Sequence, residues 1–283
     1  MNKSKIYLFF LVLVIIIAFC YQSIMQNWFI AHALGNYKGI AYTNSFEAFE
    51  SSYKKGFRQF EVELMLTNDN KVILFHGYNK GVYKKLNIPV KTFSYEDFMS
   101  GKITKIISKD ITPLNLNDFI ELMNKYKNIQ VMLHIHSNND SNITDFVIKE
   151  ILNATNYDSK ILDRLLIGIN YSRELEVLNR YPQIKNILFY VREKNKRNGE
   201  LKDIEQIISY LKENNIRIVS MPYKAVMESP KEVKALRKNK IYIYSFTQNN
   251  VMEILKMKMI GVHTIGTDGL LFSTAYLKKK FIK

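Results

Sequence analysis

Eight short apolar runs, separated by segments with helical periodicity, constrain the fold of this 283-residue chain more than any other feature. Runs of this length are expected for buried strands, and longer amphipathic stretches between them are expected for helices. Strands that alternate with helices form parallel sheets, and eight of them predict a closed (β/α)8 barrel of the TIM type. The predicted strands are 28–31, 57–66, 129–135, 165–169, 186–191, 216–220, 241–245 and 262–266.

The segments between the strands carry the expected signals for helix ends. Asn44 can cap the first helix, and Gly56 can end it. The predicted helices cover 45–56, 112–125, 142–152, 171–180, 201–213, 230–237 and 251–257, with a terminal helix over 273–280. No linker or internal repeat divides this part of the chain, so residues 28–283 are expected to form one domain.

An uncharged run of 16 apolar or aromatic residues, 6–21, follows Lys3 and Lys5. That length is marginal for a membrane-spanning helix and generous for the core of a signal peptide. No small-x-small cleavage site follows it, so we expect residues 1–27 to form a transmembrane helix, either an anchor or an uncleaved signal. A cleaved signal and a buried helix are the alternatives. Positive charge before the run predicts a cytoplasmic N-terminus, a single pass through the cell membrane, and a main domain outside the cytoplasm.

The formal net charge of the chain is +15, and Lys3 and Lys5 are the only charged residues among the first 22, which leaves +13 for the remainder. Lysines that keep helix faces soluble explain this charge most simply. The functional alternative is attraction to anionic lipid, phosphate polymers or a phosphorylated substrate. Nucleic acid is not an expected partner, because the chain has no zinc-finger spacing, RNA-binding signature or concentrated basic arm. The single cysteine, Cys20, excludes an intrachain disulfide bond.

Two glutamates and a histidine are expected to meet in the second strand and the hairpin that follows it. Glu61 and Glu63 are two residues apart, so both carboxylates project from one face of the strand. Asn68-Asp69-Asn70 predicts a turn, after which 71–75 returns antiparallel. A turn centred on Asp69-Asn70 places His76 opposite position 63, whereas a shift of one residue would move it to the other face.

These residues predict a divalent-cation site. Apolar neighbours indicate that at least one side of the strand is buried, where two unpaired carboxylates would repel each other. A cation is therefore the expected partner of Glu61 and Glu63, with His76 beside it as an acid or base. His32 ends the first strand, at the rim where barrel enzymes place catalysis. His134 and His136 alternate on one face of the third strand, as the two glutamates do on the second.

The order of these motifs resembles the glycerophosphodiester phosphodiesterase family, within the phosphatidylinositol phospholipase C-like phosphodiesterases. The family signature is a strand ending in His-Arg-Gly, Glu-Asn-Thr opening a helix, Glu-x-Asp, and a hairpin closing in His-Asp. The matching segments are His32-Ala33-Leu34-Gly35, Thr43-Asn44-Ser45, Glu61-Val62-Glu63 and His76-Gly77. Later segments continue the resemblance: Ile111-Thr112-Pro113-Leu114 is similar to the Pro-Thr-Leu helix entry, Phe246-Thr247-Gln248-Asn249 to Trp-Thr-x-Asn, and 261–269 to the final Thr-Asp strand.

The resemblance implies a role for each matching position. His32 and His76 would be the general acid and base, in either order. Glu61, Glu63 and His134 would be the metal ligands. His136 falls at a phosphate-contacting lysine, and Phe246 replaces a tryptophan of the substrate pocket. The phosphate-binding arginine of the family is replaced by Ala33, so Arg58, Lys38 or His136 would have to substitute for it.

The implied cofactor is one divalent metal ion, Ca or Mg by resemblance, or Mn or Zn if His134 is a ligand, because neutral imidazole favours the latter metals. The implied activity is hydrolysis of glycerophosphodiesters or related lipid and cell-envelope phosphodiesters to an alcohol and a phosphomonoester. A lyase that makes a cyclic phosphate is a related hypothesis, which the sequence does not separate from hydrolysis. The alternative from another class is a catalytically impaired barrel that binds phosphate polymers or lipid headgroups at the cell surface.

Overall fold

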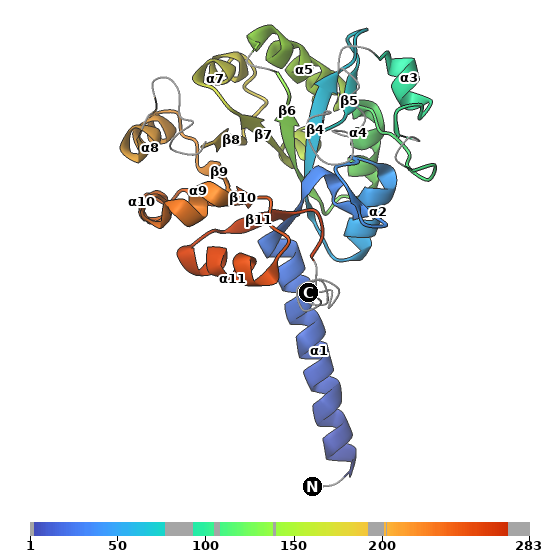
Figure 1. The fold of residues 1–283 in the computed structure, drawn as a ribbon, viewed down its shortest axis with the longest axis vertical. Helices are drawn as coiled ribbons and strands as arrows, with labels where there is room; N and C mark the ends of the chain where they lie inside the picture. Colours follow the sequence, from blue (N-terminus) through green and yellow to red (C-terminus); the bar gives the residue numbers. More distant parts are fainter. Residues whose placement is uncertain are drawn as a thin grey trace, which may run out of the picture.

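The computed structural model describes residues 3–76, 93–104, 108–137, 140–191, 201 and 203–270. A closed barrel of eight parallel strands confirms the predicted fold (Figure 1). Its first strand pairs with both the second and the last, which closes the sheet. The barrel strands are β1 (Phe29–Ala31), β4 (Gln59–Leu66), β6 (Gln130–Ile135), β7 (Leu165–Ile169), β8 (Ile187–Tyr190), β9 (Ile218–Pro222), β10 (Tyr242–Phe246) and β11 (Thr264–Thr267).

A hairpin extends the second barrel strand, as predicted. β5 (Val72–Leu74) runs antiparallel to β4, with Leu64 opposite Leu74. This register differs by one residue from the predicted one, so Phe75 rather than His76 lies opposite Glu63, and the Phe75 amide donates to the Glu63 carbonyl. The turn is therefore one residue shorter than the centred turn expected from Asn68-Asp69-Asn70. A small second sheet pairs β2 (Asn36–Tyr37) with β3 (Ile40–Ala41).

Helices connect the strands and cover the barrel. They are α2 (Phe46–Lys54), α3 (Tyr95–Met99), α4 (Leu116–Lys125), α5 (Ser141–Ala154), α6 (Ser159–Leu162), α7 (Ser172–Leu178), α8 (Ile204–Glu213), α9 (Tyr223–Glu228), α10 (Pro230–Lys238) and α11 (Val251–Ile260), with one 3-10 turn, η1 (His32–Leu34). The α2 cap is Ser45, whose hydroxyl accepts from the Ala48 amide, and not the predicted Asn44. The predicted helix 273–280 lies outside the described residues.

Two apolar layers stabilise the barrel. The larger lies between the strands and the surrounding helices, and the smaller fills the barrel interior around Ile30, Met132 and Leu188. Tyr190 and Tyr244 complete the interior layer. Glycines on neighbouring strands make room for both rings, because a Cβ on Gly168 or Gly266 would collide with Tyr190 or Tyr244 respectively.

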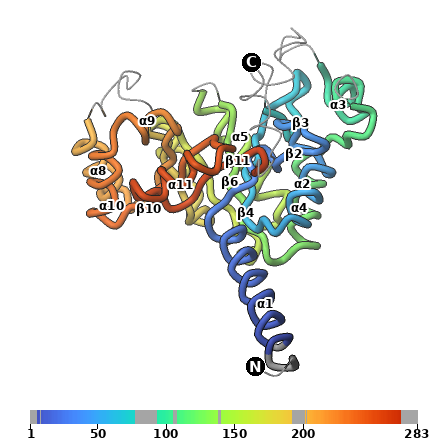
Figure 2. Tube along the Cα trace, turned by 60° about the horizontal axis from the view of Figure 1, so that its bottom comes forward, coloured from blue at the N-terminus to red at the C-terminus, as the bar shows by residue number. Residues whose placement is uncertain are grey.

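The chain begins with a long apolar helix, α1 (Lys3–Trp28), which extends away from the barrel (Figures 1 and 2). Its segment Phe9–Trp28 has a mean hydropathy of 2.2 and is almost wholly exposed. Twenty helical residues span roughly 30 Å, the thickness of a bilayer hydrocarbon core. This helix has the length and composition of a membrane span or a signal sequence. It ends at Trp28, so β1 begins one residue later than predicted.

Candidate active site

Most of the predicted functional side chains gather at the carboxyl end of the barrel strands. His32 directly follows β1, while Glu61 and Glu63 point inward from β4. His134 and His136 belong to the neighbouring strand β6 and the residue after it, and Glu63 and His134 are register partners. Each reaches the interior because alternate residues of a strand share one face.

Glu63 is the centre of this cluster. Its Oε1 lies 3.0 Å from His76 Nε2, 3.5 Å from His136 Nε2 and 3.8 Å from His134 Nδ1. His76 reaches Glu63 despite the shifted register, because the chain leaves the ladder after Phe75, whose amide still donates to the Glu63 carbonyl. Burial raises the pKa of Glu63, but the three neighbouring imidazoles outweigh it and hold the pKa well below its usual range. Glu63 is therefore ionised at neutral pH.

Three buried polar atoms in this cluster have no hydrogen-bond partner within the described part of the chain: Glu63 Oε2, His76 Nδ1 and His136 Nε2. Unpaired buried polar groups are costly, so such a group of polar atoms indicates a missing binding partner. Two sets of ligand atoms lie within 4.8 Å of one another, His32 with Glu63 and His76, and Glu63 with His134 and His136. The chemistry of these donors fits a divalent metal ion.

His32 is held by a network from the last barrel strand. Its Nδ1 donates to Asp268 Oδ1 at 2.8 Å, and Asp268 Oδ2 accepts from the Asn249 side chain. Asn249 also accepts from the Thr267 hydroxyl and the Asp268 amide. Burial alone would lower the pKa of His32, but the hydrogen bond to Asp268 and the charges of the two glutamates raise the pKa to about 9. His32 is thus an imidazolium at neutral pH.

Tyr42 lies against both candidate acid–base groups. Its ring centroid is 5.0 Å from that of His32 and 4.5 Å from that of His76, and the two imidazoles are 5.3 Å apart. Burial and nearby carboxylates raise the pKa of Tyr42 to about 12, so its phenol stays protonated. Tyr42 and Asn44 have φ values of 66° and 46°, in the left-handed region that non-glycine residues rarely adopt. Such backbone strain clusters at functional sites.

Asn44 contributes to the site rather than to a helix cap. Its Oδ1 accepts from the Glu63 backbone amide at 3.3 Å, and its buried Nδ2 has no hydrogen-bond partner among the described residues. This contact explains the position of Asn44 in the motif, because it ties the loop before α2 to the strand that carries the glutamates.

Glu61 occupies a different environment from Glu63, although both lie on one face of β4. Its two oxygens accept from Tyr244 Oη at 2.5 Å and from Tyr190 Oη at 3.3 Å. Burial raises the pKa of Glu61, and the tyrosines and His32 only partly offset this. The predicted ligand set of Glu61, Glu63 and His134 is therefore divided: Glu63 and His134 share a possible metal group, with His136, whereas Glu61 is hydrogen-bonded to tyrosines.

The remaining predicted residues are placed as follows. Phe246 ends β10 at the mouth of the barrel, with its ring beside Tyr190 and Tyr244. The His134 ring lies 4.7 Å from the Tyr190 ring, centroid to centroid, and burial lowers the pKa of His134 to about 4, so its imidazole is neutral and able to bind metal.

The prediction that Arg58 binds the substrate is wrong. Arg58 precedes the amino end of β4, at the opposite end of that strand from Glu63. Its guanidinium lies over the Tyr53 ring and donates to the Tyr53 and Phe57 carbonyls. This position cannot contact a substrate at the carboxyl end. Lys38, the other cation considered there, is exposed and paired with Asp110.

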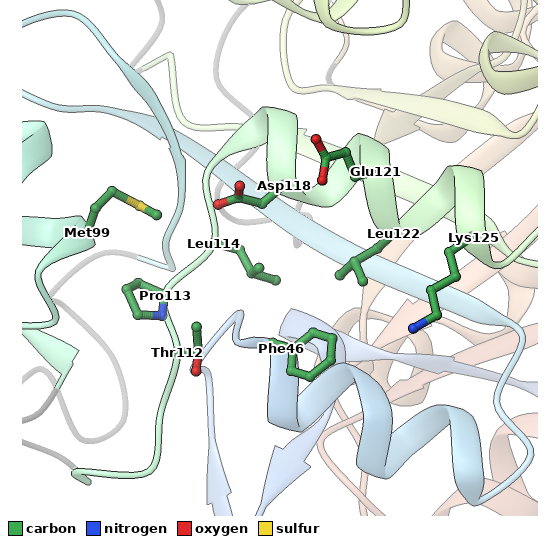
Figure 3. Close-up of a pocket in the computed structure, with 9 residues that line it drawn as sticks. All are labelled: Phe46, Met99, Thr112, Pro113, Leu114, Asp118, Glu121, Leu122 and Lys125. Carbon is green, nitrogen blue, oxygen red and sulfur yellow. The ribbon is translucent and has the colours of Figure 1, made fainter.

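A cavity of about 460 Å³ outside the barrel, between α2 and α4, is separate from this cluster. Figure 3 shows Leu122 and Lys125 of α4 extending toward Phe46 of α2 across it. None of the predicted site residues lines this cavity.

Sequence reasoning missed the tyrosines of the site. Tyr42, Tyr190 and Tyr244 lie in unremarkable sequence contexts, and only the barrel brings them to His32 and Glu61. Asp268 was better signalled, because it directly follows the last predicted strand and lies in the segment 261–269 that resembles the final Thr-Asp strand of the family.

Three solved structures resemble this fold at low sequence identity. A glycerophosphodiester phosphodiesterase from Parabacteroides distasonis aligns with a TM-score of 0.62 and 16% identity over 86% of this chain and 94% of that one. A glycerophosphodiester phosphodiesterase from Thermotoga maritima aligns with a TM-score of 0.60 and 17% identity, over 85% of this chain and 93% of that one. A phosphodiesterase from Oleispira antarctica, in complex with the product sn-glycerol-3-phosphate, aligns with a TM-score of 0.63 and 14% identity, over 87% of this chain and 95% of that one.

Comparison with curated protein sequences gives no match. The model of the glycerophosphoryl diester phosphodiesterase family, in contrast, matches residues 34–270, which include every barrel strand except β1. It also includes Glu61, Glu63, His76 and Asp268. This chain therefore belongs to the glycerophosphoryl diester phosphodiesterase family and is a phosphodiesterase.

Proposed function

We propose that this protein is a membrane-anchored, metal-dependent hydrolase of glycerophosphodiesters or related lipid and cell-envelope phosphodiesters. The products would be an alcohol and a phosphomonoester such as glycerol phosphate. The observation that carries the proposal is the pair of imidazoles, His32 and His76, 5.3 Å apart at the barrel mouth beside the ionised Glu63. Hydrolysis of a phosphodiester uses a base for the attacking hydroxyl and an acid for the leaving alcohol, and a metal ion, when bound, would stabilise the charge on the phosphate.

The metal ligands proposed here are Glu63, His134 and His136. His134 is neutral and Glu63 ionised, as ligands must be, and His136 Nε2 lacks another partner. The alternative set that includes His32 is less favourable, because His32 would have to lose its proton before it could bind a metal. One carboxylate and two imidazoles favour Mn or Zn over Ca or Mg. When bound, the ion would neutralise charge on the non-bridging phosphate oxygens.

The hydrogen bonds support His32 as the acid and His76 as the base. His32 donates Nδ1–H to Asp268, which stabilises the imidazolium, so its Nε2–H is the proton available to the leaving alcohol. His76 donates Nε2–H to Glu63, which leaves the unpartnered Nδ1 with a lone pair. Burial lowers the pKa of His76, so it is neutral and can take a proton from the attacking hydroxyl, of water or of the substrate's own glycerol. Phe246 and Tyr42 would line the substrate pocket. Asn44 Nδ2, which has no hydrogen-bond partner among the described residues, would donate to the substrate phosphate.

Anchoring by α1 would hold the proposed active site near the membrane. Trp28, the last residue of α1, is followed directly by β1, and His32 lies four residues later. Four extended residues span at most roughly 14 Å, so the site would lie close to the membrane surface. This distance supports phosphodiesters presented at or near that surface.

The decisive test is an assay of the full chain in detergent against a panel of glycerophosphodiesters, with chelator and then with Ca, Mg, Mn or Zn restored. Release of glycerol phosphate that is lost with chelator and restored best by Mn or Zn is the expected result. Activity that survives exhaustive chelation would contradict metal dependence. If nothing is cleaved under any metal, a barrel that only binds phosphate polymers or headgroups becomes the better description.

A further inference from the structure

The outer face of α11 is unusually apolar for a surface helix. Outside α1, five large apolar side chains of the described residues are exposed, and three of them, Met252, Leu255 and Met259, lie on α11. Met259 is 80% and Met252 64% exposed. Their spacing of three and four residues places them on one face of the helix. We call these three residues the α11 stripe.

The α11 stripe faces away from the barrel. Ile254 and Met257, the buried residues of this helix, lie on the opposite face and pack into the layer between strands and helices. Exposed Lys256 lies beside the stripe and pairs with Glu253 Oε1 at 2.8 Å, so the surface combines apolar side chains with an ion pair. Apolar side chains beside lysine are found on helices that lie in the plane of a membrane interface.

The helix α11 also lies on the side of the barrel from which α1 emerges. Figure 1 shows α11 at the lower edge of the barrel, crossing the direction of α1. The two helices are joined at their ends, since Lys258 Nζ lies 4.5 Å from the centroid of the Trp28 ring. Tryptophan and lysine at the end of a spanning helix mark the headgroup level of a bilayer.

The end of α1 is fixed to the barrel rather than connected by a flexible linker. Met25 is buried against Gly56. The Gln59 side chain donates to the Gln26 carbonyl at 2.8 Å, and Thr264 Oγ1 donates to the Asn27 carbonyl at 3.4 Å. A barrel held this way cannot rotate freely about the anchor, so one of its sides must face the membrane.

We propose that the α11 stripe is a second membrane contact, which rests on the bilayer that holds α1 and sets the orientation of the barrel mouth relative to the surface. The inference rests on the proposed anchoring by α1. The occupant is the bilayer interface, because the stripe is apolar, is accompanied by lysine, and continues from the membrane end of the anchor.

The test uses the full chain with Cys20→Ser, reconstituted into vesicles of equimolar phosphatidylcholine and phosphatidylglycerol. An environment-sensitive fluorophore is attached to Lys256→Cys, beside the stripe, or to Asn153→Cys, an exposed position on α5, as the matched control. Lipids with a nitroxide at headgroup depth are then added. The Lys256→Cys label should shift to the blue and be quenched by the nitroxide, and the Asn153→Cys label should do neither.

The triple variant Met252→Gln, Leu255→Gln and Met259→Gln should abolish both the blue shift and the quenching of the label. Tyr157→Gln, elsewhere on the surface, should leave both intact. A label as water-exposed as the control would overturn the proposal. A label whose emission is shifted to the blue but is not quenched would also overturn the proposal. That result would indicate that residues 271–283 or a second copy of the chain, rather than lipid, covers the stripe. Flotation and turnover of a soluble glycerophosphodiester in the same vesicles report separately on anchoring and on the proposed function.

Discussion

His32 Nδ1 lies 2.8 Å from Asp268 Oδ1, although 236 residues separate them in the chain. The contact follows from barrel closure, because β1 and β11 are neighbours with Ala31 opposite Thr267, and the next residue of each strand is His32 and Asp268. The carboxylate keeps His32 charged, and this makes the acid role of His32 testable.

Asp268→Asn should narrow the pH range of activity. With an acid of pKa about 9 and a base whose pKa is below the usual 6.5, kcat/KM should be flat between those limits and fall as pH rises through about 9. Without the Asp268 charge, the upper limb should move toward neutral pH. The same pairing contributes stability below pH 6.5 that is lost as pH rises through about 9, because folding raises the pKa of His32. An unmoved upper limb would contradict the acid assignment.

His32→Ala and His76→Ala should each lower turnover by about 10²–10⁴, because each removes a proton-transfer group. The double variant should lose much less than the product of the two, since the pair acts together. A p-nitrophenyl phosphodiester separates the roles. Its leaving group needs no proton, so His32→Ala should hardly affect it while His76→Ala still does. The reverse pattern would exchange the roles, and near wild-type rates in both single variants would refute the pair.

Glu63→Gln should abolish metal binding, whereas Glu61→Gln, on the same face of the same strand, should retain it. The reason is that Glu61 already accepts two tyrosine hydrogen bonds, while Glu63 has a free oxygen among imidazoles. Metal content after dialysis and the visible absorption of the Co-loaded protein measure this without an activity assay. His136→Gln should alter the Co spectrum if His136 is a ligand. Equal loss of metal in Glu61→Gln would return Glu61 to the ligand set.

Tyr244→Phe should destabilise the barrel, because it leaves a buried oxygen of Glu61 without its closest donor. An unsatisfied buried acceptor costs about 1–3 kcal/mol, and each kcal/mol lowers Tm by roughly 2–4 °C in a domain of this size. Tyr53→Phe is the control, since it removes only an exposed hydrogen bond to Asn128. Thermal unfolding in detergent measures both, and equal Tm values would show that Glu61 finds another partner.

The full chain should sediment with membranes, and protease added to spheroplasts should release the barrel. The physical reason is the length and exposure of the apolar segment Phe9–Trp28. A protein that is released without its first residues would indicate a cleaved signal instead, and a protein recovered wholly in the cytosol would end the anchoring proposal.

Local patterns in the sequence determined the barrel and the candidate acid–base and ligand residues. Alternating apolar strands and helices are short-range signals, and β7 was placed at its observed bounds. The spacing of Glu61 and Glu63 correctly placed them on one face, because side-chain alternation is a property of any strand. The pairing of His76 with Glu63 was expected from the hairpin, although the register differed by one residue.

Only the tertiary structure decided the distinct environments of the two glutamates and the orientation of the histidines. Tyr190 and Tyr244 reach Glu61 from strands more than 120 residues away, and two interior glycines make the room for them. Asp268 reaches His32 because the barrel closes. Arg58 was misplaced for the same kind of reason: a cation near the glutamates in sequence lies at the other end of their strand. Hydrogen-bond partners and pKa values depend on such long-range neighbours, and the sequence order of residues does not encode them directly.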